Sequence, residues 1–250
     1  MQSLEVVLLK NNLSVIVLAA GKGTRMCSDI PKVLNQINNK SMIEHVLEQT
    51  YNLKPEKLLV VIGYEYQQIK KHLKGHPLHY VLQKEQLGTA HAIMQCQKDL
   101  QTFEGSTLIL SGDVPLIKSE TLQKLYDTHK AEKAQATILS AKIQNPYGYG
   151  RIVRANDSFI SIVEEKDADD VQKNIKEING GIYIFDNRIL FENINDINNN
   201  NNQSEYYLPD IMSILIKKKY KILVHQIQNE HEIKGANTKE QLLELEKYAK

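Results

Sequence analysis

Short apolar runs rich in β-branched residues recur along the chain, and most precede a turn or a helix-like stretch. Runs of this length and composition predict β-strands. The predicted strands cover residues 14–18, 58–62, 79–82, 107–110, 136–141 and 181–185. Between them, apolar residues at helical spacing predict amphipathic helices. These cover residues 42–51, 66–73, 88–98 and 119–130. Strands that alternate with helices predict an α/β fold with a mostly parallel sheet flanked by helices.

The second half of the chain is less regular than the first. Residues 151–163 and 178–185 predict further strands around an irregular insertion at 167–176. The asparagine-rich segment 193–203 is polar and of low complexity, so we expect a mobile loop that buries no core. Residues 239–250 predict a charged helix. Its expected apolar side holds Leu242, Leu243 and Leu245.

Charge and composition exclude several classes of protein. The 250 residues include 31 Lys and Arg against 30 Asp and Glu, so no strong field would attract nucleic acid or an anionic membrane. No apolar run approaches the roughly 18–20 residues of a membrane span, and the N-terminal segment lacks a signal-peptide cleavage site. Two cysteines, Cys27 and Cys96, make no disulfide framework. We therefore expect a cytoplasmic protein that binds neither nucleic acid nor membrane.

A glycine-rich loop, LAAGKGTRMCSDIPKVL at 18–34, follows the first predicted strand. It is not a Walker A loop, because Gly21 and Gly23 lie two residues apart and no Gly-Lys-Ser/Thr follows. It also fails the dinucleotide-binding fingerprint, since Met26 stands where the third glycine belongs. What remains is a loop in which backbone amides can approach an anion, with Arg25 and Lys32 as cations beyond it.

Three candidate residues directly follow predicted strands. Gly21, Gly63 and Asp113 come just after the runs at 14–18, 58–62 and 107–110. In open α/β sheets, ligands bind outside the carboxyl ends of the strands. Arg offers a planar fork that matches phosphate oxygens, and Lys offers a compact point charge. The sequence therefore predicts a phosphate-binding site at this edge of the sheet, with Arg25 and Lys32 on the phosphates.

Several separated motifs resemble one family across nearly the whole chain. They are LAAGKGTRM…PKVL (18–34), QKEQLGTAHA (83–92), LSGDVPLI (110–117), NPYGYGRIV…IVEEKDA (145–168), EINGGIYIF (177–185), EYYLPDI (205–211) and KGANTKEQL (234–242). In this order they resemble the bacterial N-acetylglucosamine-1-phosphate uridyltransferases. The resemblance implies a Rossmann-like nucleotide-diphospho-sugar transferase fold with a small sugar-binding β insertion. It places the nucleotidyltransferase domain at 1–237, followed by the C-terminal helix at 238–250.

The resemblance also implies a reaction. UTP and N-acetylglucosamine 1-phosphate would give UDP-N-acetylglucosamine, a peptidoglycan precursor, and pyrophosphate, with Mg²⁺ as cofactor. Transfer at an α-phosphorus depends mostly on positioning and charge neutralisation, so cations and a metal can carry it. The sugar phosphate is already an anion and needs no general base. The expected catalytic residues are Arg25, Lys32 and Asp113.

The resemblance assigns further residues to parts of this site. The nucleotide-binding set is Leu18, Ala20, Gly21, Gly23, Gln83, Gly88 and Thr89. A side-chain amide donates and accepts at once, which suits a uracil edge. Mg²⁺ prefers hard oxygen ligands and takes one or two from protein. The expected metal ligands are Asp113 and Asn237. The sugar-binding set is Gly150, Glu164 and Asn179.

Two positions depart from the family pattern. Ser111 stands where the family usually has Tyr, and Gly180 where it usually has Thr. Both flank predicted contacts, so sugar or nucleotide affinity can differ. Two other functions therefore stay open: a nucleotidyltransferase for another sugar 1-phosphate or NTP, and a catalytically weak nucleotide-sugar binding module. A dinucleotide-dependent oxidoreductase fits poorly because the fingerprint fails at Met26.

The sequence also lacks a feature of many relatives in the family. The bacterial enzymes often carry a β-helix domain that acetylates glucosamine 1-phosphate and assembles trimers. Such a domain needs stacked hexapeptide turns, and no hexapeptide pattern is present here. We therefore expect a uridyltransferase without acetyltransferase activity, as a monomer or weak homodimer.

Overall fold

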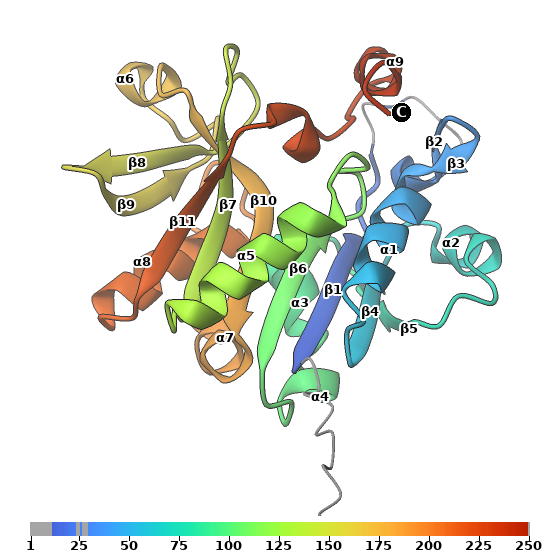
Figure 1. Ribbon diagram of the computed structural model, residues 1–250, viewed down its shortest axis with the longest axis horizontal. Coiled ribbons are helices and arrows are strands. Elements are labelled where there is room, and N and C mark those ends of the chain that lie inside the picture. Colours follow the sequence, from blue (N-terminus) through green and yellow to red (C-terminus); the bar gives the residue numbers. More distant parts are fainter. Residues whose placement is uncertain (1–11, 24–25, 27–29, 250) are drawn as a thin grey trace, which may run out of the picture.

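The computed structural model describes residues 12–23, 26 and 30–249. Its main sheet contains β1 (Leu13–Ala19), β4 (Lys57–Ile62), β5 (His79–Leu82), β6 (Ser106–Ser111), β7 (Ala136–Lys142), β10 (Glu177–Asp186) and β11 (Ile222–Ile227). Their order across the sheet is β11-β7-β10-β6-β1-β4-β5 (Figure 1). Strands β6, β1, β4 and β5 are parallel, whereas β10 is antiparallel to both β6 and β7. The expected mostly parallel α/β sheet is confirmed.

Two hairpins and several helices complete the fold. A hairpin of β8 (Arg151–Ala155) and β9 (Ser158–Val163) joins the sheet through β10, and β2 (Gln36–Ile37) pairs with β3 (Lys40–Ser41). The helices are α1 (Met42–Asn52), α2 (Tyr66–His72), α3 (Thr89–Met94), α4 (Gln97–Leu100), α5 (Ser119–Ala131), α6 (Asp170–Lys173), α7 (Asn187–Asn193), α8 (Ile211–Lys217) and α9 (Lys239–Glu246). No helix in the described part of the chain is both long and apolar enough to span a bilayer.

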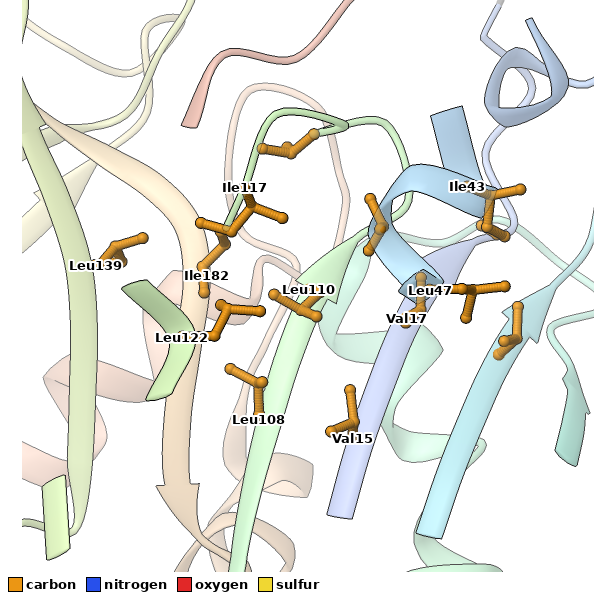
Figure 2. Packing of buried hydrophobic residues seen from close by; sticks show 14 of the residues in the cluster. Val15, Val17, Ile43, Leu47, Leu108, Leu110, Ile117, Leu122, Leu139 and Ile182 are labelled. Carbon is orange, nitrogen blue, oxygen red and sulfur yellow. The ribbon is translucent and has the colours of Figure 1, made fainter. Parts of the chain in front are cut away.

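The sheet separates two apolar cores, one on each face. Alternate residues of a strand point to opposite faces, so Val15 and Val17 of β1 enter one core while Ile16 enters the other. The first core packs under α1 and α5, as Figure 2 shows for Ile43, Leu47 and Leu122. The second packs under α3, α7 and α8. Because both faces are covered, β1 is buried along nearly its whole length and reads as a continuous apolar run.

Two expected elements differ from those observed. The helix expected at 88–98 is divided into α3 and α4, which are separated by Gln95 and Cys96. The strand expected at 151–163 is the hairpin β8–β9, because Asn156 and Asp157 adopt positive φ and reverse the chain. Asn and Asp tolerate this conformation better than other non-glycine residues.

The prediction that residues 193–203 bury no core is wrong for their first half. Asn193 ends α7, and Ile194 and Ile197 are 0% and 5% exposed in the second core. Polar composition concealed two isoleucines at a spacing of one helical turn. Residues 198–203 do form an exposed loop, and Asn202 donates from its side chain to the backbone oxygen of Lys166 at 2.9 Å.

The prediction for the apolar side of the C-terminal helix included one residue too many. Leu245 is 2% exposed and packs with Ile37 and Ala236, and Leu242 lies partly buried against the same cluster. Leu243 is 61% exposed. An i, i+3 pair can share one face of a helix, whereas the residue between them is rotated away from it.

The buried side chain of Asn187 joins the amino ends of two central strands to the α4 turn. Asn187, at the start of α7, is fully buried and donates to the backbone oxygens of Leu100 and Phe103, both at 2.7 Å. Its side-chain oxygen accepts from the Thr107 hydroxyl at 2.7 Å, and that hydroxyl lies 2.7 Å from the Ser14 hydroxyl. Strands β1 and β6 and the α4 turn are thus joined through one amide.

Replacing Asn187 should destabilise the fold without altering the site. In Asn187→Ala the backbone oxygen of Phe103 loses the Asn187 amide as its partner, and a buried unsatisfied group costs about 1–3 kcal/mol. The Leu100 oxygen keeps the bond from the Phe103 amide and the Thr107 hydroxyl keeps its contact with Ser14, so each of these loses one hydrogen bond, worth about 1 kcal/mol. We expect the free energy of unfolding to fall by about 3 kcal/mol in urea denaturation. Asn200→Ala, in the exposed loop, is the control and should change it by less than about 0.5 kcal/mol. Equal stability of the two variants would contradict this account.

Candidate functional site

The carboxyl ends of β1, β5 and β6 border a cavity of about 570 Å³. Because these strands run parallel in one sheet, with β4 between β1 and β5, their following loops meet at one edge of the sheet. The structure gathers there most of the predicted nucleotide and metal residues. Those that line the cavity are Leu18, Ala20, Gly21, Gly23, Lys32, Gln83, Gly88, Thr89, Asp113 and Asn237.

The glycine loop reaches the cavity by a close approach of backbone to side chain. Gly23 has a φ of +60°, and a Cβ there would lie 2.4 Å from the Cβ of Lys32. Only glycine combines this left-handed conformation with so short a distance. The loop therefore packs directly against Lys32. Arg25 and Cys27 lie outside the described residues.

Lys32 is the centre of the cavity's polar contacts. It begins a short 3₁₀ turn after Pro31, and its ammonium donates to the carboxylate of Asp113 and, at 2.7 Å, to Oδ1 of Asn237. The side chains of Lys32 and Asp113 are 12% and 22% exposed, so solvent screens this ion pair only partly. Two oxygens from distant parts of the chain thus converge on one cation.

Local structure holds the two oxygen donors in place. Asp113 follows β6 in a turn, and its backbone oxygen accepts from the amide of Ala236 at 3.3 Å. The amide of Asn237 donates to the Gln241 side chain at 2.7 Å, while Thr238 caps α9. The C-terminal helix therefore anchors the loop that presents Asn237. Thr238 and Gln241 contribute to the site by this route.

The donor set suits a hard divalent cation. Asp113 and Asn237 offer a carboxylate and an amide oxygen, and both already bind a positive charge. Among the described residues, no group of three or more His, Cys, Asp or Glu side chains is placed to hold a metal ion. A Mg²⁺ ion on these two oxygens would thus take its other ligands from phosphates and water, as Mg²⁺ usually does.

Gln83 forms the wall at the far end of the cavity. It is 3% exposed, and its amide nitrogen donates to the backbone oxygen of Gly88 and contacts Nδ1 of His91, both at 3.1 Å. Gly88 has a φ of +113°, and a Cβ there would lie 2.5 Å from the Tyr206 backbone oxygen. The NH₂ group of Gln83 is therefore already hydrogen-bonded to other parts of the protein. We expected Gln83 to donate and accept at a base, and its carbonyl oxygen is the group that remains.

The hydroxyl of Thr89 is also used within the protein. It accepts from the backbone amide of Leu208 at 2.9 Å, and the amide of Ala90 donates to the Tyr206 backbone oxygen at 2.9 Å. These contacts hold the motif EYYLPDI against the start of α3. Thr89 therefore links the wall of the cavity to a segment more than a hundred residues away.

A second cavity of about 230 Å³ adjoins the first where the β8–β9 hairpin begins and ends, at Gly150 and Glu164. It contains the predicted sugar residues Gly150, Glu164 and Asn179 and shares Asp113 and Asn237 with the larger cavity. The Asn179 side chain donates to the Tyr183 hydroxyl at 2.6 Å and accepts from the amide of Gly181 at 3.1 Å. At Gly150 a Cβ would lie 3.0 Å from Oε1 of Glu164. Close backbone approach therefore shapes this end of the cleft.

Glu164 is electrostatically unusual. Burial, followed by the nearby charges of Asp210 and Asp167, raises the pKa of Glu164 to about 7, and Arg151 opposes the shift. The pKa of its neighbour Glu165 is shifted in the opposite direction. Burial would raise the pKa of Glu165, but hydrogen bonds from Arg151 and from the amide of Gly148 outweigh it and lower that pKa.

The two departures from the family pattern lie in the cleft. Ser111 lines both cavities. A Cβ at Gly180 would lie 2.9 Å from the Leu139 backbone oxygen and 3.0 Å from Cγ2 of Ile233. The threonine usual in the family would therefore collide here with the backbone of Leu139 as well as with Ile233.

Sequence reasoning missed several residues of the cleft, among them three with polar side chains. Gln86 and Glu205 line the larger cavity, and Tyr149 lines the smaller one. Gln86 donates to the backbone oxygen of Gln83 at 3.0 Å and so supports the far wall. All three lie within motifs that the sequence analysis had already singled out, so membership of these motifs could have marked them as candidates. Only the positions of the loops in the structure show that their side chains border the cleft.

The sheet order and the cleft define a class, the nucleotidyltransferases with the nucleotide-sugar transferase fold. A solved structure of UDP-glucose pyrophosphorylase complexed with UDP-glucose has a TM-score of 0.77 at 19% identity, covering 94% of this chain and 97% of that one. A candidate glucose-1-phosphate thymidylyltransferase from Bacillus anthracis has a TM-score of 0.74 at 18% identity, covering 95% of each chain. The nucleotidyl transferase family model matches residues 14–230, and the chain belongs to that family.

Curated relatives within this family are more similar in sequence than the two solved structures. The bifunctional protein GlmU of Streptococcus uberis is 46% identical over 223 residues, 89% of this chain and 48% of the relative. GlmU of Streptococcus mutans is 46% identical over 233 residues, 93% of this chain and 50% of the relative. GlmU of Staphylococcus haemolyticus is 44% identical over 235 residues, which are 94% of this chain and 52% of the relative. The chain spans about half the length of the curated relatives it matches.

The raised pKa of Glu164 predicts a pH-dependent stability difference. The unfolded chain releases this proton near pH 4.5, whereas the folded protein holds it to about pH 7. Wild-type stability should therefore fall as pH rises through this window and level off above it. Glu164→Gln has no proton to release, so its advantage in the free energy of unfolding should grow by about 2 kcal/mol between pH 5 and pH 8.

Glu165→Gln is the matched control with the opposite sign. The lowered pKa of Glu165 stabilises the folded protein above the ordinary carboxyl range, so this variant should be less stable than wild type throughout pH 5 to 8. Urea unfolding of the three proteins across this range provides the measurement. A Glu164→Gln advantage that is constant with pH would contradict the assignment.

Proposed function

We propose that this chain transfers UMP from UTP to N-acetylglucosamine 1-phosphate and releases pyrophosphate. The observation that carries the proposal is the convergence of Lys32, Asp113 and Asn237 where the two cavities meet. A nucleoside triphosphate in the larger cavity and a sugar phosphate in the smaller one would bring their phosphates together at this point. UDP-N-acetylglucosamine is then the product.

The comparisons support this choice of reaction. The chain's motifs resemble those of N-acetylglucosamine-1-phosphate uridyltransferases, and its curated relatives are named GlmU. A structure of the same fold was solved with UDP-glucose. The alternative, a nucleotidyltransferase for another sugar 1-phosphate or NTP, rests on Ser111, which lines both cavities, and on Gly180, which lines the smaller one.

The proposed chemistry is a displacement at phosphorus. An oxygen of the sugar 1-phosphate forms a bond to the α-phosphorus of UTP, and the bond to the bridging oxygen breaks, so pyrophosphate leaves with that electron pair. The attacking oxygen is already an anion, and no proton must be removed. Lys32 would bind the reacting phosphates, with Arg25 as the second cation. Positioning and charge neutralisation of this kind carry most phosphoryl-type transfers.

Asp113 and Asn237 would hold the Mg²⁺ that such transfers use. When bound, the ion supplies positive charge to the phosphate oxygens. Lys32 now binds both of these side chains, so the same groups would orient its ammonium beside the phosphates. The three residues therefore form one charge-balanced cluster rather than independent contacts.

The two ends of the cleft would select the substrates. The carbonyl oxygen of Gln83 would accept from N3–H of uracil, with backbone at Leu18, Ala20, Gly21 and Gly88 along the nucleotide and Thr89 and Gly23 beside them. At the other end, the Gly150 backbone, Glu164 and Asn179 would contact the sugar. A Glu164 carboxyl with a pKa of about 7 can be a donor or an acceptor to hydroxyls near neutral pH.

A substrate panel tests this proposal. Purified protein is incubated with each of four NTPs and with the 1-phosphates of N-acetylglucosamine, glucose and glucosamine, with and without Mg²⁺, and pyrophosphate release is followed. We expect UTP with N-acetylglucosamine 1-phosphate to give the highest kcat/KM, only with Mg²⁺. A higher kcat/KM for another pair would establish a nucleotidyltransferase for those substrates. No turnover with any pair would favour the catalytically weak binding module.

Asp113→Asn should lower turnover at least about a hundredfold at saturating substrate. The change removes the negative charge beside Lys32 and the metal site, and electrostatic groups of this kind are worth roughly 2.7–4 kcal/mol. Glu120→Gln, on the exposed start of α5, is the control and should leave turnover unchanged. Near wild-type turnover of Asp113→Asn across a Mg²⁺ titration would remove Asp113 from the mechanism.

Lys32→Ala and Gln83→Ala should differ in what they damage. A phosphate contact carries no information about the base, so Lys32→Ala should lower kcat for UTP and CTP alike. An acceptor that fits only one base discriminates, so Gln83→Ala should mainly reduce the UTP to CTP ratio of kcat/KM. Steady-state kinetics with both nucleotides gives these ratios. A changed ratio in Lys32→Ala with an unchanged one in Gln83→Ala would reverse the assignment.

A further inference from the structure

His91 lies directly behind Gln83, on the first turns of α3. Its Nδ1 is 3.1 Å from the amide nitrogen of Gln83, and its Nε2 is 3.1 Å from the amide nitrogen of Gln95, one helical turn further on. The imidazole is also 6.4 Å, centroid to centroid, from the ring of Tyr206. Among the described residues that line the larger cavity, Gln83 is present and His91 is not. His91 can therefore reach a nucleotide only through Gln83.

The hydrogen bonds of Gln83 determine which tautomer His91 must adopt. The backbone oxygen of Gly88 can only accept, so the Gln83 group that faces it is NH₂. The second proton of that NH₂ group faces Nδ1 of His91. The amide nitrogen of Gln95 faces Nε2, but it also donates to the backbone oxygen of His91 at 3.1 Å. A neutral imidazole accepts at only one nitrogen. Because Gln83 is buried and Gln95 is only partly buried, the Gln83 amide has the greater need of this acceptor, so we assign the lone pair to Nδ1 and the proton to Nε2. Two acceptors, one from the backbone and one from His91, therefore hold the amide of Gln83 in a single orientation.

The orientation of this amide would decide which pyrimidine it recognises. Uracil presents a donor at N3 and an acceptor at O4, whereas cytosine presents an acceptor at N3 and a donor at the exocyclic amine. A glutamine fixed with its carbonyl oxygen toward the base pairs with N3–H of uracil and meets the N3 lone pair of cytosine unfavourably. The reversed amide would favour cytosine.

We propose that His91 is a positioning residue for base selection, because its Nδ1 holds the Gln83 amide in the orientation that accepts from uracil. This role rests on the proposed uridyltransferase function. His91 itself touches neither the base nor the reacting phosphates. Gly88 alone fixes one proton of the amide, and His91 adds the second contact that disfavours the reversed orientation.

Replacing His91 provides the test. In His91→Phe no acceptor faces the second amide proton, and the reversed amide becomes accessible. We expect the UTP to CTP ratio of kcat/KM to fall about tenfold, the range that one hydrogen bond supports, with an increase in kcat/KM for CTP itself. A general loss of structure would lower both values together. His91→Ala makes the same test with a smaller side chain if the phenylalanine variant does not fold.

Two further variants separate positioning from packing. His91→Asn can place a side-chain oxygen near the position of Nδ1, so it should restore the ratio to within about twofold of wild type. His129→Phe removes a buried histidine away from the cleft, whose Nδ1 lies 2.9 Å from the Thr137 hydroxyl, and should leave the ratio unchanged. In a Gln83→Ala background, His91→Phe should have no additional effect on the ratio.

The possible outcomes separate this inference from the proposed function. If wild type shows no preference for UTP, the proposed function fails. If wild type prefers UTP but His91→Phe and His91→Ala keep its ratio, the inference is overturned and the function stands. An equal loss with both nucleotides also overturns it. A lower ratio with a gain for CTP, rescued by His91→Asn, supports it.

Discussion

The ammonium of Lys32 binds Asp113 and Asn237, and the rest of the cleft is arranged around this contact. The three residues come from the glycine loop, the turn after β6 and the loop before α9, which are separated by 81 and 205 positions. A partly buried cation needs fixed oxygen partners, and partly buried carboxylates need a cation. Each segment is thus held in place by a charge that another segment supplies, at the position where two phosphates would meet.

The sheet makes this contact possible. Parallel strands β4, β1 and β6 deliver their loops to one edge, and the apolar cores on both faces hold the strands in register. Around the cleft, close backbone approach at Gly23 and Gly88 admits Lys32 on one side and the Tyr206 segment on the other. Gly180 is crowded in the same way by the Leu139 backbone and by Ile233. The cleft is therefore shaped as much by missing side chains as by those that point into it.

Most of the fold could be predicted because its strands are short apolar runs with buried faces on both sides. Boundaries failed where local composition hid a tertiary role, as at Ile194 and Ile197 within the asparagine-rich segment. The motif residues were placed in two adjoining cavities, but periodicity could not show that the NH₂ group of Gln83 is used within the protein. Nor could it show His91 behind Gln83. These facts depend on contacts between β5 and α3, which only the packed structure determines.

A crystal structure of the protein with UTP and Mg²⁺ tests the central claim most directly. The account predicts the metal on the oxygens of Asp113 and Asn237, the ammonium of Lys32 against the phosphates, and N3 of uracil within hydrogen-bonding distance of the Gln83 carbonyl oxygen. The smaller cavity, at the base of the β8–β9 hairpin, should stay open for the sugar phosphate. A triphosphate bound away from Lys32, or a metal held by other side chains, would contradict the account.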